Sequence, residues 1–313
     1  MQIQSIRKFF KMKPALNVSG IEKEADIKGQ ALHKALQSNS ELSEKNLAKL
    51  APVLINYGYH SLPSKAKVIS IVNNKGGVGK TTTTAILGEA FARLGLRVLL
   101  IDLDSQGNLS HIYGIDADSG QVADTMLDIK KSLAIRPINE YLSIVPSNLK
   151  LQEVESLLLT AASNQNRLKA ALSSSTISQD YDFILIDCPP SLGLLTMNAL
   201  NASNSCLITV HPEATAVVGL NSIFNVIEDV KLYGGNNLVV EGILFTMVEK
   251  NSVHDSYKEF VREEYSSFRI FESEIKKSVD VAKAQALAEQ FYVYKGKSHV
   301  GVSYEEVAKE ILS

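Results

Sequence analysis

The stretch that decides the fold runs from Val68 to Thr82 and reads VISIVNNKGGVGKTT. Its first five residues are apolar or small and mostly β-branched, which is typical of a buried strand. Glycines and two lysines follow, and the apolar residues over 81–94 then recur at helical spacing. A strand, a glycine-rich loop and a helix in this order predict the start of an α/β domain with a phosphate-binding loop.

The same alternation of strand and helix continues along the chain. Further apolar runs of strand length lie at residues 97–102, 142–146, 183–187, 206–210 and 239–245, with helical segments between most of them. Strands that are apolar throughout and alternate with helices are typical of a parallel sheet with helices on both faces. The expected fold class is therefore α/β over residues 65–313. A small all-α region over residues 1–64 is expected to precede it, ending in a breaker-rich linker at 57–64.

The composition is that of a soluble globular protein with one or two domains, because 45% of the 313 residues are apolar and 21% are charged. No run approaches the roughly 20 apolar residues of a membrane helix, and the N-terminus lacks the apolar core of a signal peptide. Cys188 and Cys206 have no metal-ligand spacing and are expected to be reduced thiols. We therefore expect a cytoplasmic protein with no membrane partner.

The loop at residues 73–82 is predicted to hold ATP and Mg²⁺. Its glycines allow the backbone N–H groups to turn inward around a phosphate at the N-terminus of the next helix. Lys80 would reach the β- and γ-phosphates, and the Thr81 hydroxyl would ligate Mg²⁺. The alternative is a glycine-rich turn that contains Gly-Lys-Thr by chance. The predicted nucleotide-binding residues are Lys75, Gly76, Gly77, Val78, Gly79, Lys80, Thr81 and Thr82.

The loop departs from the common G-x-x-x-x-G-K-T pattern, because Asn74 stands at the first glycine position and Lys75 follows it. It resembles the deviant phosphate loop of the ParA/MinD family of ATPases. In that family the early lysine crosses a dimer interface to the partner's bound phosphates, and Lys75 matches its position. The resemblance implies a homodimer that forms on ATP binding, in which a second cation stabilises the transferring phosphoryl group.

Two strand ends carry carboxylates that match this family. Asp104 lies in the segment DLDSQGN at residues 102–108 and matches the family's water-orienting carboxylate, although Ser105 replaces the usual proline. The catalytic residues implied are thus Lys75, Lys80 and Asp104. The alternative is that Asp102 and Asp104 only cap the next helix, and Asp102 suits that role.

The second strand end, at residues 183–187, resembles the Walker B strand of the family. Asp187 at its end would hold Mg²⁺ together with Thr81. The loop that follows contains Pro189 and Pro190 and matches the family's switch segment. Cys188 is expected to be a small buried residue rather than a redox centre.

The resemblance covers residues 67–313 and points to one branch of the family. The chain lacks the cluster-bridging cysteines of nitrogenase reductase, and its acidic C-terminal segment is unlike the basic membrane helix of MinD. What remains is similar to the DNA-partition ATPases of the ParA branch. That branch implies non-specific DNA binding by the ATP-bound dimer on the nucleoid, and weak ATP hydrolysis that a centromere-binding partner protein stimulates. The candidate DNA-binding lysines, each of which could also be an ordinary surface charge, are Lys276, Lys277, Lys283, Lys295 and Lys297.

Residues 1–66 form a basic leader with ten basic and five acidic residues, which leaves a net charge of −7 on the remainder. Residues 21–36 have the layout of a helix-turn-helix, with the turn at 26–29 and Asp26 where a glycine is common. A helical dimerisation or docking domain is the alternative. A DNA reader here would add sequence-specific binding and autorepression. Ala25, Ile27, Leu32 and Leu36 are the expected core positions, and Lys28, Gln30, His33 and Lys34 the expected DNA contacts.

Two rival functions are compatible with these patterns. The first is a related ATPase that positions another cargo, such as a protein cluster, over the nucleoid. The second is a transcriptional regulator in which ATP only sets the oligomeric state.

Overall fold

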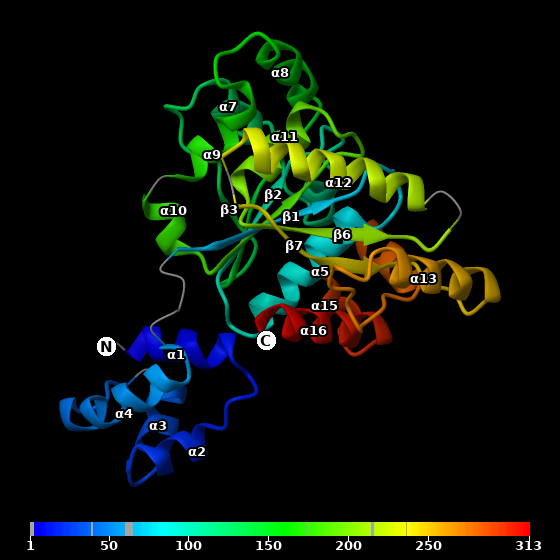
Figure 1. Ribbon diagram of the computed structural model, residues 1–313. Helices are drawn as coiled ribbons and strands as arrows, with labels where there is room; N and C mark the ends of the chain where they lie inside the picture. Colours follow the sequence, from blue (N-terminus) through cyan, green and yellow to red (C-terminus); the bar gives the residue numbers. More distant parts are fainter. Residues whose placement is uncertain (1–2, 39, 60–64, 174, 214–215, 236) are drawn as a thin grey trace. The chain divides into compact units, whose positions relative to one another are not determined.

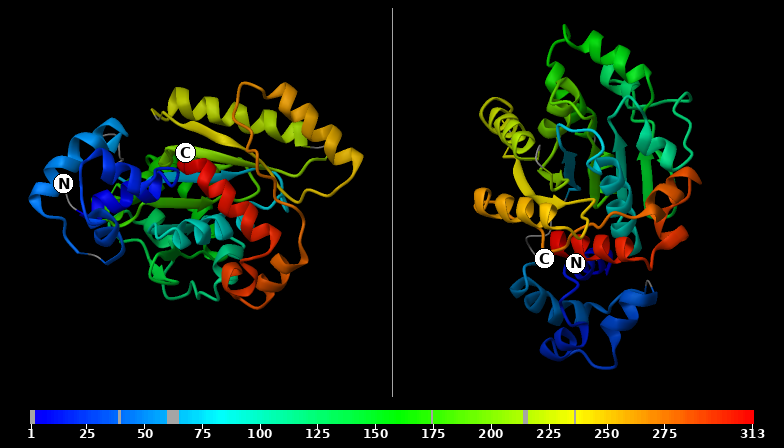
Figure 2. Two further views of the ribbon diagram at one scale, coloured as in Figure 1. Left: turned by 90° about the horizontal axis from the view of Figure 1, so that it is seen from below. Right: turned by 90° about the vertical axis from the view of Figure 1, so that its right-hand side faces the viewer.

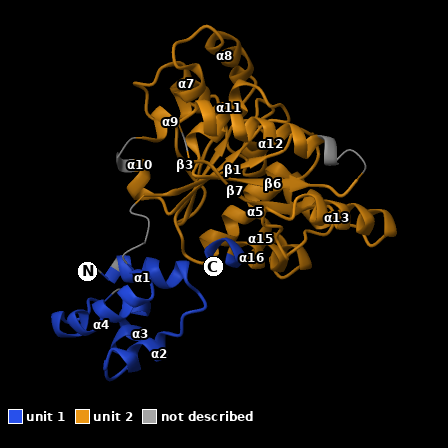
Figure 3. Ribbon diagram, viewed as in Figure 1, with its two compact units in different colours: residues 1–64, 309–313 blue, residues 65–308 orange. Residues whose placement is uncertain are grey.

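The computed structural model describes residues 3–38, 40–59, 65–173, 175–213, 216–235 and 237–313, so residues 60–64 of the predicted linker lie outside the described part of the chain. The structure divides into two compact units, residues 1–64 with 309–313, and residues 65–308 (Figure 3).

The first unit is all-helical. Its helices are α1 (Ile3–Met12), α2 (Val18–Glu24), α3 (Ala31–Ser38) and α4 (Glu44–Asn56). The sequence shows no clear period over residues 1–17, so α1 was not predicted. Its Ile6 and Phe9 lie three residues apart, on one side of the helix, and both are buried in the core of this unit. The other fully buried side chains of this core include Leu32, Leu50 and Leu54.

The turn between α2 and α3 contains the predicted turn at residues 26–29. Asp26 has a φ of 47° and Gly29 a φ of 74°. Asp26 therefore adopts the left-handed conformation that glycine tolerates best, which explains why glycine is common at this position. Lys49 holds Asp26 in place through an ion pair of 2.5 Å. Of the predicted core positions, Ala25, Ile27 and Leu32 are buried and Leu36 is partly buried.

The second unit is built on one twisted sheet (Figure 1) with the strand order β3-β4-β2-β5-β1-β6-β7. All neighbouring strands are parallel except β3 and β4, which are antiparallel. The α/β prediction is confirmed, and the short antiparallel β3 is an addition to it. The strands are β1 (Lys67–Val72), β2 (Val98–Asp102), β3 (Arg136–Pro137), β4 (Leu142–Val145), β5 (Phe183–Asp187), β6 (Ser205–Val210) and β7 (Val239–Phe245).

Helices cover both faces of this sheet (Figure 1). They are α5 (Lys80–Arg93), α6 (Asn108–Ile112), α7 (Val122–Leu127), α8 (Lys150–Leu158), a 3₁₀ turn (Asn164–Asn166), α9 (Arg167–Leu172), α10 (Ser175–Asp180), α11 (Leu194–Ala202), α12 (Ala216–Tyr233), α13 (Ser252–Glu264), α14 (Val279–Ala286), α15 (Phe291–Lys295) and α16 (His299–Leu312).

Alternation along the strands decides which side chains meet which helices. Val68 and Ile184 belong to the core on the face that α11 and α12 cover. Phe183, one residue from Ile184, points to the opposite face and stacks on Phe91 of α5 with ring centroids 4.3 Å apart. Gly88 allows α5 to approach the sheet, because a Cβ there would lie 2.6 Å from a methyl group of Leu100.

The helices α12 and α13 lie side by side (Figure 2), and Phe268 in the segment after α13 stacks on Phe224 of α12 with ring centroids 4.4 Å apart. The carboxyl ends of the parallel strands meet at one edge of the sheet. The connection from β1 leads to β2 on one side of the sheet, and the connection from its neighbour β5 leads to β6 on the other. In doubly wound sheets a ligand site lies at such a switch point.

Candidate functional site

A cleft of about 430 Å³ opens at the carboxyl ends of the strands. This volume lies within the size range for small-molecule and cofactor sites. Loops after β1, β2, β5 and β7 contribute to it, together with α6 and α14. The lining residues are Gly76, Gly77, Gly79, Lys80, Thr81, Thr82, Asp104, Gln106, Asn108, His111, Ile112, Pro190, Met247 and Gln285.

The loop after β1 curls around one end of the cleft and leads directly into α5. Gly77 and Gly79 have φ values of 73° and 79°, which side chains with a Cβ rarely adopt. Val78 between them is buried, and its carbonyl accepts a hydrogen bond of 2.9 Å from the Thr246 hydroxyl at the end of β7. The predicted loop residues therefore present backbone N–H groups at a helix N-terminus, which is a favourable setting for a phosphate.

Lys80 begins α5 and is the cation of the cleft. Its side chain is only 6% exposed, and its ammonium group donates a hydrogen bond of 2.6 Å to the carbonyl of Lys75. Burial lowers the pKa of Lys80, while the negative charges of Asp187 and Asp104 act in the opposite direction. The ammonium group is thus held along the loop and close to carboxylates on two neighbouring strand ends.

Asp187 at the end of β5 fits a cation ligand. It is fully buried, and neither carboxylate oxygen accepts a hydrogen bond at normal distance from a described residue. Burial raises the pKa of Asp187 well above its usual value, although the nearby Thr81 hydroxyl and Lys80 oppose this shift. A buried carboxylate without donors is costly unless it is neutralised or binds a cation. The donor set of Thr81 and Asp187 is of the oxygen type that Mg²⁺ prefers.

No cluster of three or more His, Cys, Asp or Glu side chains that could hold a metal by itself occurs among the described residues. A cation bound at Thr81 and Asp187 would therefore complete its ligands with phosphate oxygens and water. This is how Mg²⁺ usually binds in nucleotide sites.

The two aspartates after β2 have different environments. Asp102 is fully buried, and one of its oxygens accepts hydrogen bonds from the backbone N–H of Ser110 (2.9 Å) and the Ser110 hydroxyl (2.7 Å). It thus accepts a backbone N–H of the first turn of α6, although the N-cap residue of this helix is Gly107. Asp104 lines the cleft, and its carboxylate accepts one hydrogen bond of 3.0 Å from the backbone N–H of Gln106. Asp104 is therefore the one of the two that faces the cleft.

Comparison with known proteins agrees with this geometry. Residues 66–240 match a family model described as an AAA domain. The chain is 37% identical over 254 residues to the sporulation initiation inhibitor protein Soj of Bacillus subtilis, an alignment that covers 78% of this chain and 98% of Soj. It is 33% identical over 254 residues to the chromosome partitioning protein ParA of Caulobacter vibrioides, covering 79% of this chain and 94% of that protein.

The chain belongs to the ParA/MinD family of ATPases.

A solved structure supports the same assignment for the fold of this ParA/MinD-family chain. Cobyrinic acid a,c-diamide synthase from Mycobacterium smegmatis, with a bound ATP analogue and magnesium, aligns with a TM-score of 0.67 at 31% identity. The alignment covers 78% of this chain and 93% of that one. The ligands of that structure are the two that were predicted for the cleft of this family member.

Several cleft residues of this family ATPase were not predicted from the sequence. Gln285 on α14 donates a hydrogen bond of 3.1 Å from its side-chain amide to the hydroxyl of Thr82. Met247 lines the cleft with a φ of 52°. Gln106, Asn108 and His111 follow Asp104 closely, and an interpretation of that segment as one cleft-facing loop could have included them. For Gln285 and Met247 no local motif marks the position.

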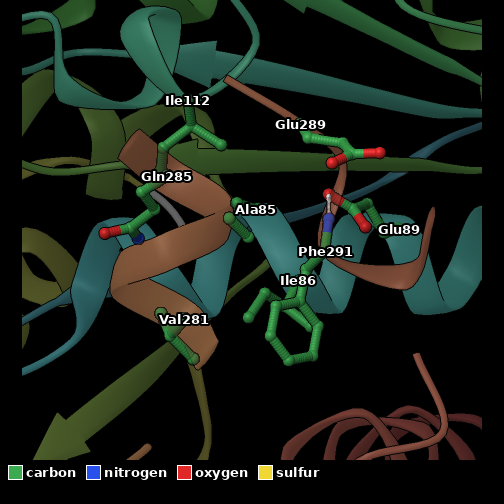
Figure 4. Close-up of a pocket in the computed structure, with 9 residues that line it drawn as sticks. Ala85, Ile86, Glu89, Ile112, Val281, Gln285, Glu289 and Phe291 are labelled. Atoms are coloured by element: carbon green, nitrogen blue, oxygen red, sulfur yellow. Dashed lines mark hydrogen bonds between the residues drawn. The ribbon is translucent and has the colours of Figure 1, made fainter. Parts of the chain in front are cut away.

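A small second pocket of about 10 Å³ lies between α5 and α14 (Figure 4) and adjoins the cleft, since Ile112 and Gln285 line both. Glu89 of α5 lies at its edge and accepts hydrogen bonds from the backbone N–H groups of Phe291 (3.2 Å) and Tyr292 (2.9 Å). Burial raises the pKa of Glu89 to about 7, against the effect of these donors. The phosphate-loop helix of this family fold is thus tied to α15 through an acid that titrates near neutrality.

The predicted DNA contacts of the first unit lie on or beside α3. Lys28, Gln30 and Lys34 are exposed, whereas His33 is half-buried. Glu22 of α2 is buried and accepts hydrogen bonds from the backbone N–H groups of Leu32 (2.7 Å) and His33 (3.2 Å). This carboxylate fixes the start of α3 relative to α2.

The predicted C-terminal lysines of this family member are all exposed. Within the part of the chain that the structure describes, Lys277 is the one of the five that forms an ion pair, at 2.6 Å from Glu249.

Both cysteines are free and buried, as expected. Burial raises the pKa of Cys206 to about 12 and that of Cys188 well above its usual value, so both thiols are protonated at neutral pH. No helix in the described part of this family ATPase is long and apolar enough to cross a membrane.

Proposed function

We propose that this chain is a DNA-partition ATPase. Its ATP-bound homodimer binds DNA non-specifically over the nucleoid, and a centromere-binding partner protein on the cargo stimulates hydrolysis and releases the dimer. The proposal is supported by the similarity to Soj and to the chromosome partitioning protein ParA over nearly their whole lengths. It is also supported by the composition of the phosphate loop, which contains two lysines.

ATP with Mg²⁺ is the proposed ligand of the cleft. The backbone N–H groups of residues 76–82 would bind the phosphates, and Lys80 would neutralise the β- and γ-oxygens. Thr81 and Asp187 would hold Mg²⁺, which supplies a Lewis acid for the phosphate oxygens when bound. Asp104 would orient a water molecule toward the γ-phosphate.

The position of Lys75 is the observation that carries the dimeric part of the proposal. Lys80 lines the cleft, but Lys75 is not among the lining residues. Its ammonium group lies 3.6 Å from Glu213, and its side chain is 25% exposed. A phosphate-loop lysine that does not line its own cleft would serve a second subunit, where it would stabilise charge on the transferring phosphoryl group.

The test is ATP hydrolysis by the wild type, Lys75→Ala and Lys65→Ala, each with and without non-specific DNA and the cognate partner protein. Lys65 is exposed and precedes β1, so it controls for the loss of one surface lysine. We expect stimulation to disappear in Lys75→Ala and to persist in Lys65→Ala. Undiminished stimulation in Lys75→Ala would refute the role across the dimer, and negligible turnover of the wild type with both additions would favour an ATP-switched regulator.

For the first unit we propose a DNA reader that recognises the chain's own promoter. The support is a helix-turn-helix layout in which exposed polar side chains lie on and beside α3, the second helix. Footprinting with Lys34→Ala should show weaker protection, and Lys45→Ala on α4 is the matched control because Lys45 is an exposed lysine of the same unit. The absence of a discrete protected site with the wild type would instead support a dimerisation domain.

A further inference from the structure

The loop that carries Lys75 is fixed to the neighbouring strand β6. Asn73 at its start is buried, and its side-chain amide donates a hydrogen bond of 2.5 Å to the carbonyl of Thr209. The amide oxygen of Asn73 accepts a hydrogen bond of 2.9 Å from the backbone N–H of Lys75. Because β1 and β6 are parallel neighbours, the segments that follow them begin side by side. The position of Lys75 is therefore set by the end of β6.

An acid in the segment after β6 faces this lysine. Glu213 places one carboxylate oxygen 3.6 Å from the ammonium nitrogen of Lys75. A turn at the end of the strand, in which the backbone N–H of Glu213 donates to the carbonyl of His211 at 2.9 Å, holds the acid near this place.

The second oxygen of Glu213 is engaged from the other side. It lies 3.5 Å from Nδ1 of His211, whose ring packs edge-to-face on His254 with centroids 5.3 Å apart. His254 is itself fixed, because its Nδ1 accepts a hydrogen bond of 3.0 Å from the backbone N–H of Glu249. The carboxylate of Glu213 thus lies between an imidazole that is anchored to the fold and the lysine.

The ion pair and the proposed role of Lys75 compete. A lysine that reaches the phosphates of another subunit has to leave Glu213, and the Coulomb attraction of the pair opposes that movement. An ion pair that is present in each monomer and absent in the dimer opposes dimerisation, and its free energy enters the dimerisation constant once for each of the two subunits.

We propose that Glu213 is a positioning residue that holds Lys75 within its own subunit and so sets how readily the ATP-bound chain dimerises. This inference rests on the proposed function of Lys75. Glu213 acts through the lysine and has no contact with nucleotide in this assignment. Because both side chains are partly exposed, the effect is modest, about two- to fivefold in the dimerisation constant.

The test is the dimer dissociation constant of the full chain, measured by sedimentation with a non-hydrolysable ATP analogue and Mg²⁺. Glu213→Gln keeps the size of the side chain and removes the charge, and we expect dimerisation about two- to fivefold tighter than in the wild type. Glu249→Gln is the matched control, because Glu249 has the same exposure (45% against 46%) and pairs with Lys277 instead. Equal dissociation constants for the two variants would overturn the proposal.

A double-mutant cycle with Lys75→Ala separates this role from a general effect on the loop. If Glu213 acts through Lys75, Glu213→Gln has no effect in the Lys75→Ala background. A gain that persists there shows that Glu213 acts elsewhere and contradicts the inference. If Lys75→Ala by itself leaves both dimerisation and stimulated turnover unchanged, the proposed role of Lys75 across the dimer fails. If Lys75→Ala lowers dimerisation and stimulated turnover, while Glu213→Gln and Glu249→Gln have equal dissociation constants, only the proposed role of Glu213 fails.

Discussion

At the scale of single residues, the segment after β2 places two aspartates with one residue between them in opposite situations. Asp102 is fully buried, and burial raises its pKa while three hydrogen-bond donors partly offset that rise. Asp104 reaches the cleft instead. Side chains alternate along an extended segment, and the two residues separate here because the chain leaves the strand after Asp102. The carboxyl group in contact with the cleft is the one suited to chemistry.

These two sites predict opposite phenotypes for the same substitution. If Asp104 orients the attacking water as proposed, Asp104→Asn should lower stimulated ATP turnover about 100-fold or more, and ATP binding should persist. Asp102→Asn should lower the free energy of unfolding by about 1–3 kcal/mol, because an amide N–H would face the donors of Ser110. Turnover assays, equilibrium ATP binding and urea denaturation of both variants provide the check. Equal losses of turnover at equal stability would contradict the assignment.

At the scale of elements, the turn between β2 and α6 depends on Gly107. Its φ is 63°, and a Cβ at this position would lie 2.6 Å from the backbone carbonyl oxygen of Ser147. Gly235 has a similar φ of 59°, but a Cβ there would have no neighbouring atom within 4 Å among the described residues. Both glycines therefore adopt the left-handed conformation, but only Gly107 also lies so close to another backbone segment that a Cβ would clash with it.

Gly107→Ala and Gly235→Ala should consequently differ in stability. For Gly235→Ala we expect a loss of about 1 kcal/mol from the left-handed conformation alone. For Gly107→Ala the clash with a backbone atom adds about 1–3 kcal/mol, and Asp104 should move with the turn. Urea denaturation of both variants measures the difference. Equal losses of unfolding free energy in the two variants would mean that the backbone at Ser147 moves to accommodate the added methyl group without destabilising the protein.

The contact between α5 and α15 is the second element-scale feature, and it predicts a pH dependence. The pKa of Glu89 is 4.5 in its unperturbed state and about 7 in the fold. The native state therefore holds a proton that the unfolded chain releases, so stability falls as the pH rises from 4.5 to 7 and is level above that.

The loss from Glu89 amounts to no more than about 3 kcal/mol. Glu89→Gln has no group that titrates here and should not show this pH-dependent loss. The free energy of unfolding of the variant should therefore rise relative to that of the wild type between about pH 5 and pH 7.5. Urea denaturation across this range measures the difference, and a constant difference would show that Glu89 titrates normally.

At the scale of the whole molecule, charge is distributed unevenly. The basic leader carries +5 and the remaining residues −7. Non-specific DNA binding by a chain with an acidic body requires local clusters of cations, and the exposed lysines near the C-terminus are the candidates. Adjacent Lys276 and Lys277 provide an internal comparison, because Lys277 is paired with Glu249 at 2.6 Å.

Binding of the ATP-bound dimer to random-sequence DNA should weaken steeply with salt. Lys276→Ala should reduce the slope of log K against log salt by about 1 for each phosphate that the variant no longer binds. Lys277→Ala should reduce it less, because Glu249 already neutralises that charge in the free protein. Fluorescence anisotropy from low to moderate salt gives both slopes. An unchanged slope in Lys276→Ala would place the DNA surface elsewhere.

The residue pattern by itself determined the parts of this protein that depend on neighbours in the sequence. Short-range periodicity and the placement of glycines depend on only a few neighbouring residues. They predict the loop at residues 73–82, the buried strands, and the two helices on either side of the turn at residues 26–29. The ParA/MinD resemblance rests on the same local segments. Lys80, Thr81, Asp104 and Asp187 could therefore be proposed as site residues from the sequence.

Tertiary structure alone decided which distant residues meet them. The Thr246 hydroxyl donates a hydrogen bond to the carbonyl of Val78, and the Gln285 amide donates one to the Thr82 hydroxyl. Glu213 forms an ion pair with Lys75, although the two residues are far apart along the chain. These partners carry no local motif, since threonine, glutamine and glutamate occur at many positions of the chain. Their roles arise because parallel strands bring their carboxyl ends to one edge of the sheet, whatever the separation of those strands along the chain.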